Sequence, residues 1–260
     1  MKKVFLLMTT ALFSFDARAV TCTATPECAA LGYKYTETEC EKGAVKCPSG
    51  SSYFCPNPRP KCNIGDIFYT DYTCVAAANH NSSKTVLGIV VHVNDNGVGG
   101  QIMAPWPIDT NGNKTSSNST TMIWGGYGTN ISSLPDYTSN SSASTDYDSC
   151  GNTDKIVAAG GASTYPAAWA ARKYAPTTET AGKWCLPAAG IMTNIYNNQT
   201  AIQDAISKVG GVSYPSCCTW SSSENDNRWA WESAFNGSNG LGTYNKYGST
   251  SVYVRPVLEF

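Results

Sequence analysis

Histidine is nearly absent from this chain and charge is scarce: the two histidines are His80 and His92, and charged residues make up 14%. No two cysteines have the C-x-x-C spacing of a zinc site, and neither a nucleophile–base pattern nor a glycine-rich phosphate loop occurs. We therefore predict a protein that is not an enzyme, with no cofactor and no metal. The formal net charge of −1 and the lack of a basic cluster argue against a nucleic-acid partner.

Residues 1–19 have the pattern of a signal peptide. A basic start precedes an apolar run, and Ala17-Arg18-Ala19 fits a small-x-small cleavage site. The run is shorter than the ~20 residues needed to cross a bilayer, and no later run approaches that length. We expect export after cleavage at Ala19, to the cell surface or the medium, with the periplasm as the alternative, and no membrane span.

Eleven cysteines in an exported chain favour disulfides over metal binding. Residues 20–62 hold an even set that can close on itself in any of fifteen pairings: Cys22, Cys28, Cys40, Cys47, Cys55 and Cys62. This block has few aliphatic residues, so disulfides must hold it together. We expect it to be a separable module with no bridge to the rest. The remaining cysteines are odd in number, so one thiol stays without a disulfide partner. We expect it at Cys217 or Cys218, unless a disulfide joins the two modules.

Residues 63–260 have the composition of a second, larger domain. Residues 67–69 and the β-branched run 86–93 are typical of strands, and the turn at 94–97 predicts a hairpin with residues 100–104. His92 lies within the long run, so we interpret it as a packed imidazole.

Two helices are expected in the following part of the chain, together with a further stretch of helical spacing. Residues 166–174 are alanine-rich, Pro187 precedes a helix with Ile191 and Ile195 one turn apart, and residues 199–209 end at a glycine pair. Their apolar stripes indicate core packing. Before them, residues 105–149 form a long polar segment, and loops of that length are usually functional or mobile.

The last forty residues form a polar segment with apolar residues at both ends. Of the 33 residues from Ser221 to Tyr253, 21 are Ser, Asn, Gly, Tyr or Thr. Antibody contact loops use the same residue types, in which rigid aromatics supply area and small polar side chains supply hydrogen bonds. We predict a binding face on a buried scaffold, and the expected scaffold residues are Trp220, Trp231, Val254 and Val257.

An ordered set of motifs resembles a known family. The motifs are Gly151-Asn152-Thr153-Asp154-Lys155-Ile156, Tyr165-Pro166-Ala167-Ala168, Trp184-Cys185-Leu186-Pro187, Ile195-Tyr196, Trp220-Ser221-Ser222-Ser223-Glu224, Trp229-Ala230-Trp231 and Val254-Arg255-Pro256-Val257. Over residues 64–260 the chain resembles the family named for the C-terminal domain of a bacterial collagen-like surface protein. The resemblance implies an α+β, C-type-lectin-like fold.

The ending, residues 219–260, is similar to the variable proteins of diversity-generating retroelements. That resemblance implies a diversified face whose candidate ligand-binding residues are Asn225, Asn227, Asn236, Asn239, Thr243, Tyr244, Asn245, Tyr247, Ser249 and Tyr253. The tyrosines would be the energetic anchors and the other side chains would set orientation. The Glu-Pro-Asn and Trp-Asn-Asp motifs of calcium-dependent sugar-binding lectins are absent. Formylglycine-generating enzymes share the fold, but Cys217-Cys218 does not reproduce their cysteines.

These observations predict an exported protein that binds a protein or glycan ligand through its C-terminal segment. The alternative is a structural or adhesive surface protein whose polar ending contacts no ligand.

Overall fold

A computed structural model describes residues 45–46, 53–54, 61–94, 99–215, 217–234, 240–248 and 252–260. The chain divides into two compact units, Met1–Asn57 and Pro58–Phe260. In the first unit, β1 (Val45–Lys46) pairs antiparallel with β2 (Tyr53–Phe54). The expected signal peptide lies outside the described residues.

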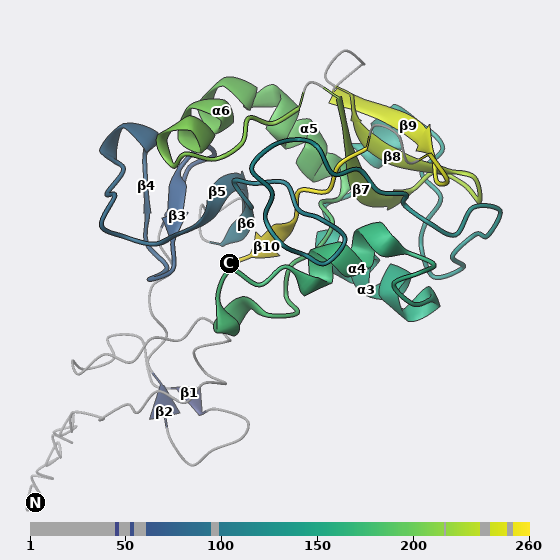
Figure 1. Ribbon diagram of the computed structural model, residues 1–260, viewed down its shortest axis with the longest axis horizontal. Helices are drawn as coiled ribbons and strands as arrows, with labels where there is room; N and C mark the ends of the chain where they lie inside the picture. Colours follow the sequence, from purple (N-terminus) through teal and green to yellow (C-terminus); the bar gives the residue numbers. More distant parts are fainter. Residues whose placement is uncertain are drawn as a thin grey trace, which may run out of the picture. The chain divides into compact units, whose positions relative to one another are not determined.

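The second unit contains a five-stranded sheet in the order β10-β6-β5-β3-β4, with antiparallel pairing throughout (Figure 1). Its strands are β3 (Ile67–Tyr69), β4 (Cys74–Val75), β5 (Val86–Val93), β6 (Gly100–Met103) and β10 (Val257–Glu259). The two strands expected at 67–69 and 86–93 and the return strand from residue 100 are confirmed. His92 packs as an imidazole, because its ring stacks on Tyr147 at 4.9 Å and Nδ1 is 3.0 Å from Asn194 Nδ2.

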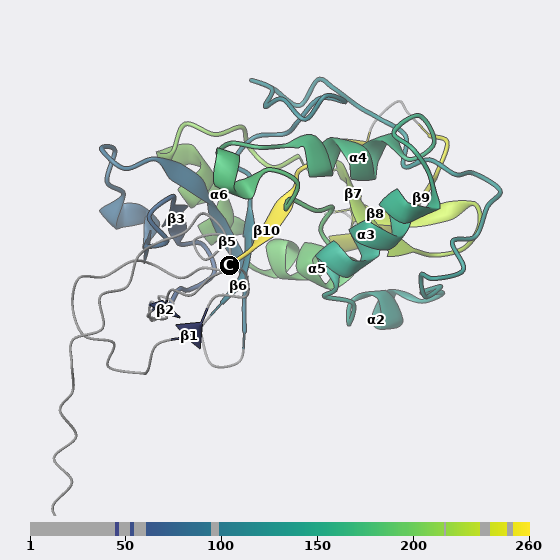
Figure 2. The ribbon, with the colours of Figure 1, turned by 90° about the horizontal axis from the view of Figure 1, so that it is seen from below.

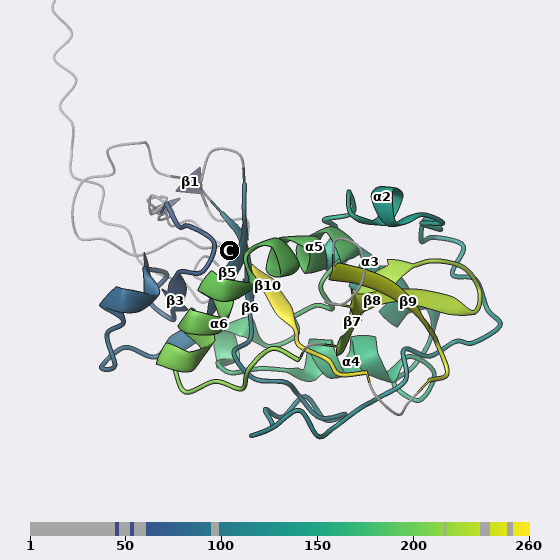
Figure 3. The same cartoon turned by 90° about the horizontal axis from the view of Figure 1, so that it is seen from above.

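The polar C-terminal segment forms strands of its own. A three-stranded antiparallel sheet has the order β7-β8-β9. Its strands are β7 (Cys217–Glu224), β8 (Trp229–Ala234) and β9 (Leu241–Asn245). In Figures 1, 2 and 3 this sheet lies at the opposite end of the second unit from β3.

Helices cover both sheets. They are the 3-10 helices η1 (Ala77–Asn79) and η2 (Thr178–Thr180) and the α-helices α2 (Asn140–Ala143), α3 (Ser149–Ala159), α4 (Pro166–Lys173), α5 (Ala189–Asn197) and α6 (Gln199–Lys208). The two expected helices correspond to α4 and α5, the stretch of helical spacing at 199–209 forms α6 as a helix of its own, and α2 and α3 were not predicted. Helix α5 contacts both β5 and β8, so it joins the two sheets, while α3 packs on α4 and β7 (Figure 2). Among the described residues, no helix is both long and apolar enough to cross a membrane.

The predicted scaffold residues are buried. Trp220, Val254 and Val257 have 0% exposure and Trp231 has 5%. Trp220 donates from Nε1 to the Met122 carbonyl at 2.7 Å, so its one polar atom has a partner inside the core. The described part of the chain is therefore an α+β domain with antiparallel sheets and a core that includes the scaffold predicted from the sequence.

The disulfides correct one prediction. Cys62 pairs with Cys74, so the cysteines of residues 20–62 do not all pair among themselves. The two cysteines are 12 residues apart, and the bridge joins the segment before β3 to the first residue of β4. The other cysteines expected in the N-terminal module lie outside the described residues. Cys218 is disulfide-bonded as well, which agrees with a structural use of that cysteine.

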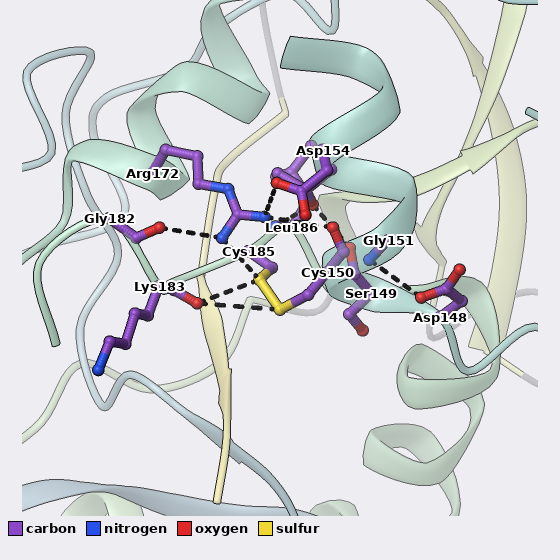
Figure 4. Close-up of polar contacts among 11 residues, drawn as sticks. Asp148, Ser149, Cys150, Gly151, Asp154, Arg172, Gly182, Lys183, Cys185 and Leu186 are labelled. Atoms are coloured by element: carbon purple, nitrogen blue, oxygen red, sulfur yellow. Dashed lines mark hydrogen bonds and ion pairs between the residues drawn. A yellow bond between two sulfur atoms is a disulfide. The ribbon is translucent and has the colours of Figure 1, made fainter. Parts of the chain in front are cut away.

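A second bridge, Cys150–Cys185, ties the start of α3 to the segment before α5 (Figure 4). The Arg172 guanidinium of α4 donates to the Cys150 carbonyl at 3.2 Å and forms an ion pair with Asp154. It also donates to the Gly182 carbonyl at 3.1 Å. The arginine therefore ties α4 to α3, and the bridge ties α3 to Cys185, which exchanges backbone hydrogen bonds with Val257 at the start of β10.

Candidate ligand-binding surface at one end of the second sheet

Three segments meet where β7 ends, β8 begins and β9 ends. They are the turn 225–228, the residues 246–248 that follow β9, and the loop 124–131. The Lys246 amide donates to the Arg228 carbonyl at 2.9 Å, and the Gly128 amide donates to the Asn227 carbonyl at 2.8 Å. The long polar loop and the polar ending therefore form one surface, although a hundred residues of chain, roughly, separate them.

We call this the sheet-end surface and define it by Tyr127, Asn227, Arg228, Trp229, Thr243, Asn245 and Tyr247. Its aromatic side chains are strongly exposed: 48% for Tyr127, 40% for Trp229 and 71% for Tyr247. Among the described residues, one other large apolar side chain, Tyr147 at 41%, is this exposed. The rings of Tyr127 and Tyr247 meet edge to face with centroids 6.4 Å apart. Exposed aromatic rings that contact each other, as Tyr127 and Tyr247 do, are typical of binding surfaces.

A buried ion pair supports the sheet-end surface from below. The side chains of Lys246 and Glu224 are both 0% exposed and form a salt bridge. Lys246 Nζ also donates to the Thr129 carbonyl at 3.2 Å and lies 4.8 Å from the centre of the Trp124 ring. The Glu224 carboxylate accepts a hydrogen bond from the Ile131 amide at 3.2 Å. The pair thus fastens the loop 124–131 to the sheet.

The electrostatics of this pair reflect its burial. Burial raises the pKa of the Glu224 carboxyl, and the hydrogen bond from Lys246 opposes that rise. Burial likewise lowers the pKa of the Lys246 amine, against the attraction of Glu224. Each group compensates the charge of the other, so removing either one leaves an uncompensated group in a buried site.

Two glycines fix the path of the loop below Tyr127. Gly125 has φ +104°, and a Cβ there would lie 1.9 Å from the Thr164 carbonyl oxygen. Gly126 has φ +63°, and a Cβ would lie 2.4 Å from Cε1 of Tyr165. Only glycine fits such close approaches at positive φ. The loop therefore passes tightly over Tyr165 and presents Tyr127 to solvent.

The turn 225–228 is also held in place. The Asp226 carboxylate accepts hydrogen bonds from the amides of Arg228, at 2.6 Å, and Trp229, at 2.8 Å. Asn225 donates from Nδ2 to the Tyr137 carbonyl at 2.8 Å, so its side chain supports the turn. A turn with its own hydrogen bonds loses little entropy when a ligand binds.

The structure brings together part of the predicted site. Asn227, Thr243 and Tyr247 are exposed and Asn245 is half-buried, with its side-chain oxygen accepting from the Tyr247 amide at 2.9 Å. All four lie in the sheet-end surface. Asn236, Asn239 and Ser249 were also predicted and lie outside the described residues.

Two predicted tyrosines lie elsewhere. Tyr244 was expected to point outward, but it is half-buried with its ring edge-on to Trp220 at 6.0 Å. The Tyr244 ring also packs closely on Gly248, because a Cβ at Gly248 would lie 2.2 Å from Cε1 of Tyr244. Tyr253 pairs by its backbone with Thr219 on β7, at the edge of the sheet away from β9. Tyr244 is thus part of the scaffold, and Tyr253 is separated from Tyr247 by the width of the sheet.

Tyr127 and Trp229 were not among the predicted site residues. Tyr127 stands in Trp124-Gly125-Gly126-Tyr127-Gly128, and an aromatic flanked by glycines inside a polar loop is a signal that could have identified it. Trp229 had the appearance of a core residue beside Trp231. The alternation of side chains along a strand does not reveal that Trp229 is exposed and Trp231 is buried. Both rings project from the same face of β8, but Trp229 is its first residue.

Comparisons with known proteins bear on the fold. No protein-family model matches the chain, and no curated protein matches it either. Among solved structures, the chain is similar to a fimbrial protein from Bacteroides ovatus, with a TM-score of 0.51 and 14% sequence identity. The match covers 76% of this chain and 49% of the fimbrial protein, so this chain spans about half of that protein's length. At this identity the likeness concerns the fold alone.

Proposed function

We propose that this protein is an exported, non-enzymatic binding protein that grips a protein or glycan ligand with its sheet-end surface. The observation that carries the proposal is the pair of exposed tyrosines Tyr127 and Tyr247, whose rings meet edge to face, with Trp229 exposed at the start of β8, on segments that are fixed from below. Tyrosine and tryptophan bury a large area on binding and lose few rotatable bonds. A rigid support reduces the entropy lost on binding still further.

The scaffold that we propose is the C-type-lectin-like fold. In support, most of the motif residues that carry the resemblance lie in the core, with Trp184 and Trp220 at 0% and Arg255 at 1% exposure, whereas Asp154 and Trp229 are exposed. Residues between those motifs, such as Asn227 and Tyr247, are exposed. This division suits a diversified binding face, in which substitutions change the ligand contacts and leave the scaffold unaltered.

The alternative is a structural or adhesive surface protein whose polar ending is not diversified. Its support is the fold shared with a fimbrial protein. In that case the contacts that matter would be made to other copies or subunits, and the sheet-end surface would have one fixed partner.

The gene and its neighbourhood distinguish the two. For diversification, we expect a reverse transcriptase gene and a near-copy template of the segment encoding residues 219–260, with differences confined to adenines. Sequencing many clones should then show substitutions at Asn227, Asn245 and Tyr247 and none at Glu224 or Lys246. A segment that is identical in all clones, with no template nearby, favours the alternative.

Binding itself is tested by probing arrays of glycans and surface proteins with the exported protein. The Tyr127→Ala, Tyr247→Ala double variant is the site probe, and Tyr147→Ala is the control, since it removes an exposed tyrosine, at 41%, that is not part of the sheet-end surface. Array signals that survive in the double variant would contradict the proposed site.

A further inference from the structure

A groove of about 580 Å³ lies away from the sheet-end surface and shares no residue with it. Three segments form it, residues 80–86, 106–114 and 174–176, with Val209 at the end of α6. Val86, Trp106, Tyr174, Pro176 and Val209 supply apolar lining, and His80, Ser82, Lys84, Asn113 and Lys114 supply polar groups. A pocket of this size and mixed lining suits a small ligand.

The charge in the groove has one sign. Its lining includes two lysines and a histidine and no Asp or Glu. Lys84 is paired with Asp71 at 2.8 Å and donates to the Thr73 hydroxyl at 2.9 Å, which leaves its charge largely compensated. Lys114 is exposed, and its Nζ lies 4.8 Å from the centre of the Trp106 ring. Lys114 is therefore the cation that can take a ligand.

The neighbouring carboxylate is engaged elsewhere. Asp109 accepts hydrogen bonds from the amides of Asn111, at 2.8 Å, and Asn113, at 2.9 Å. A second contact, from Asn113 Nδ2 at 3.2 Å, occupies its other oxygen. Asp109 thus shapes the loop that carries Lys114, and its oxygens face the loop's own donors.

Both walls of the groove are fixed. Gly112 has φ +81°, and a Cβ there would lie 2.6 Å from the Lys173 carbonyl carbon, so the loop is pressed against the end of α4. On the other side, the Tyr69 hydroxyl lies 3.0 Å from His80 Nδ1 and accepts from the Asn81 amide at 2.8 Å. These contacts pre-organise the groove without any ligand.

We propose that this groove binds an acidic sugar, either free or as a residue of a glycan. The Trp106 ring offers an apolar face for the C–H side of a pyranose, and the Lys114 ammonium pairs with the sugar carboxylate. The exposed amide of Asn113 and the hydroxyl of Ser82 are suited to sugar hydroxyls. The groove shares no residue with the sheet-end surface, so an experiment can refute either proposal without refuting the other.

Isothermal titration of the full exported protein tests the proposal. The probes are oligosaccharides of galacturonate, glucuronate and N-acetylneuraminate, each with its methyl ester as the uncharged match. We expect the acid to bind at least about tenfold more tightly than its ester, because a charge-assisted hydrogen bond is lost in the ester. Lys114→Gln should remove that difference, and Trp106→Leu should weaken both forms.

Two controls locate the site. Lys155→Gln removes a lysine on α3 and should leave the affinity unchanged. Tyr147→Ala, which removes an exposed tyrosine outside both the groove and the sheet-end surface, should also leave the affinity unchanged. Failure of all three acids to bind at millimolar concentration overturns the proposal. Equal binding of acid and ester, or an acid affinity that Lys114→Gln leaves intact, overturns it as well.

Discussion

Replacing Lys246 by methionine removes one half of a salt bridge in which both side chains are 0% exposed. The Glu224 carboxylate then retains the Ile131 amide, at 3.2 Å, as its remaining donor in the described structure. Breaking a buried pair in this way costs about 3–5 kcal/mol of the free energy of unfolding, because an uncompensated charge stays behind. Urea denaturation followed by tryptophan fluorescence measures the loss.

The double variant Lys246→Met, Glu224→Gln is the matched control. Glutamine keeps an oxygen acceptor for the Ile131 amide and carries no charge, so the double variant should recover most of the loss. Lowering the pH should also reduce the difference in unfolding free energy between wild type and the single variant. Burial raises the pKa of Glu224, and protonation of this carboxylate removes the unpaired charge. A single variant within about 1 kcal/mol of wild type would show that the pair reaches water, as exposed pairs are worth that little.

Three further predictions concern stability. Burial raises the pKa of Glu232 from 4.5 to about 8, so the stability it contributes is complete below pH 4.5 and is lost as the pH rises through 8. Wild type should lose roughly 5 kcal/mol of unfolding free energy across that window, and Glu232→Gln should flatten the profile in denaturation curves at several pH values. Changing Cys150 and Cys185 together to serine should cost about 4 kcal/mol in urea denaturation, from the 35-residue loop that the bridge closes. Tyr244→Ala should cost about 2 kcal/mol, since the half-buried ring lies edge-on to Trp220. The argument for Glu232 would be contradicted if the unfolding free energy of wild type did not change with pH. The argument for the disulfide would be contradicted if the double serine variant were as stable as wild type, and that for Tyr244 if Tyr244→Ala melted like wild type.

The sequence predicted those elements in which apolar residues recur with a regular period. Strand β5 is β-branched, and α5 and α6 place isoleucines on one face, so each pattern matches a side that is buried. Helix α3 was missed because it buries polar side chains. Ser149 donates to Gln101 at 2.7 Å and Asn152 donates to Asp146 at 2.8 Å, so hydrogen bonds replace the apolar stripe that a pattern search requires.

The sheet-end surface could be predicted in part for a similar reason. Composition indicated the C-terminal segment, and the family resemblance supplied Asn227 and Tyr247 as candidates within it. Tyr127 belongs to the surface through backbone hydrogen bonds such as that from Gly125 to Lys246, at 3.0 Å, and no local pattern encodes a contact between such distant segments. The orientation of Tyr244 depends on the packing of Trp220, which a period-two pattern does not reveal.

The most direct test of the sheet-end surface is the affinity of the Tyr127→Ala, Tyr247→Ala variant for a ligand found on the arrays, measured by isothermal titration beside wild type. Interfaces concentrate their energy in a few aromatics, so we expect binding to weaken by about 2 kcal/mol or more, roughly 30-fold. The melting temperature should stay near that of wild type, because both rings are exposed. A folded variant that binds at full affinity would contradict the assignment of the ligand to this surface.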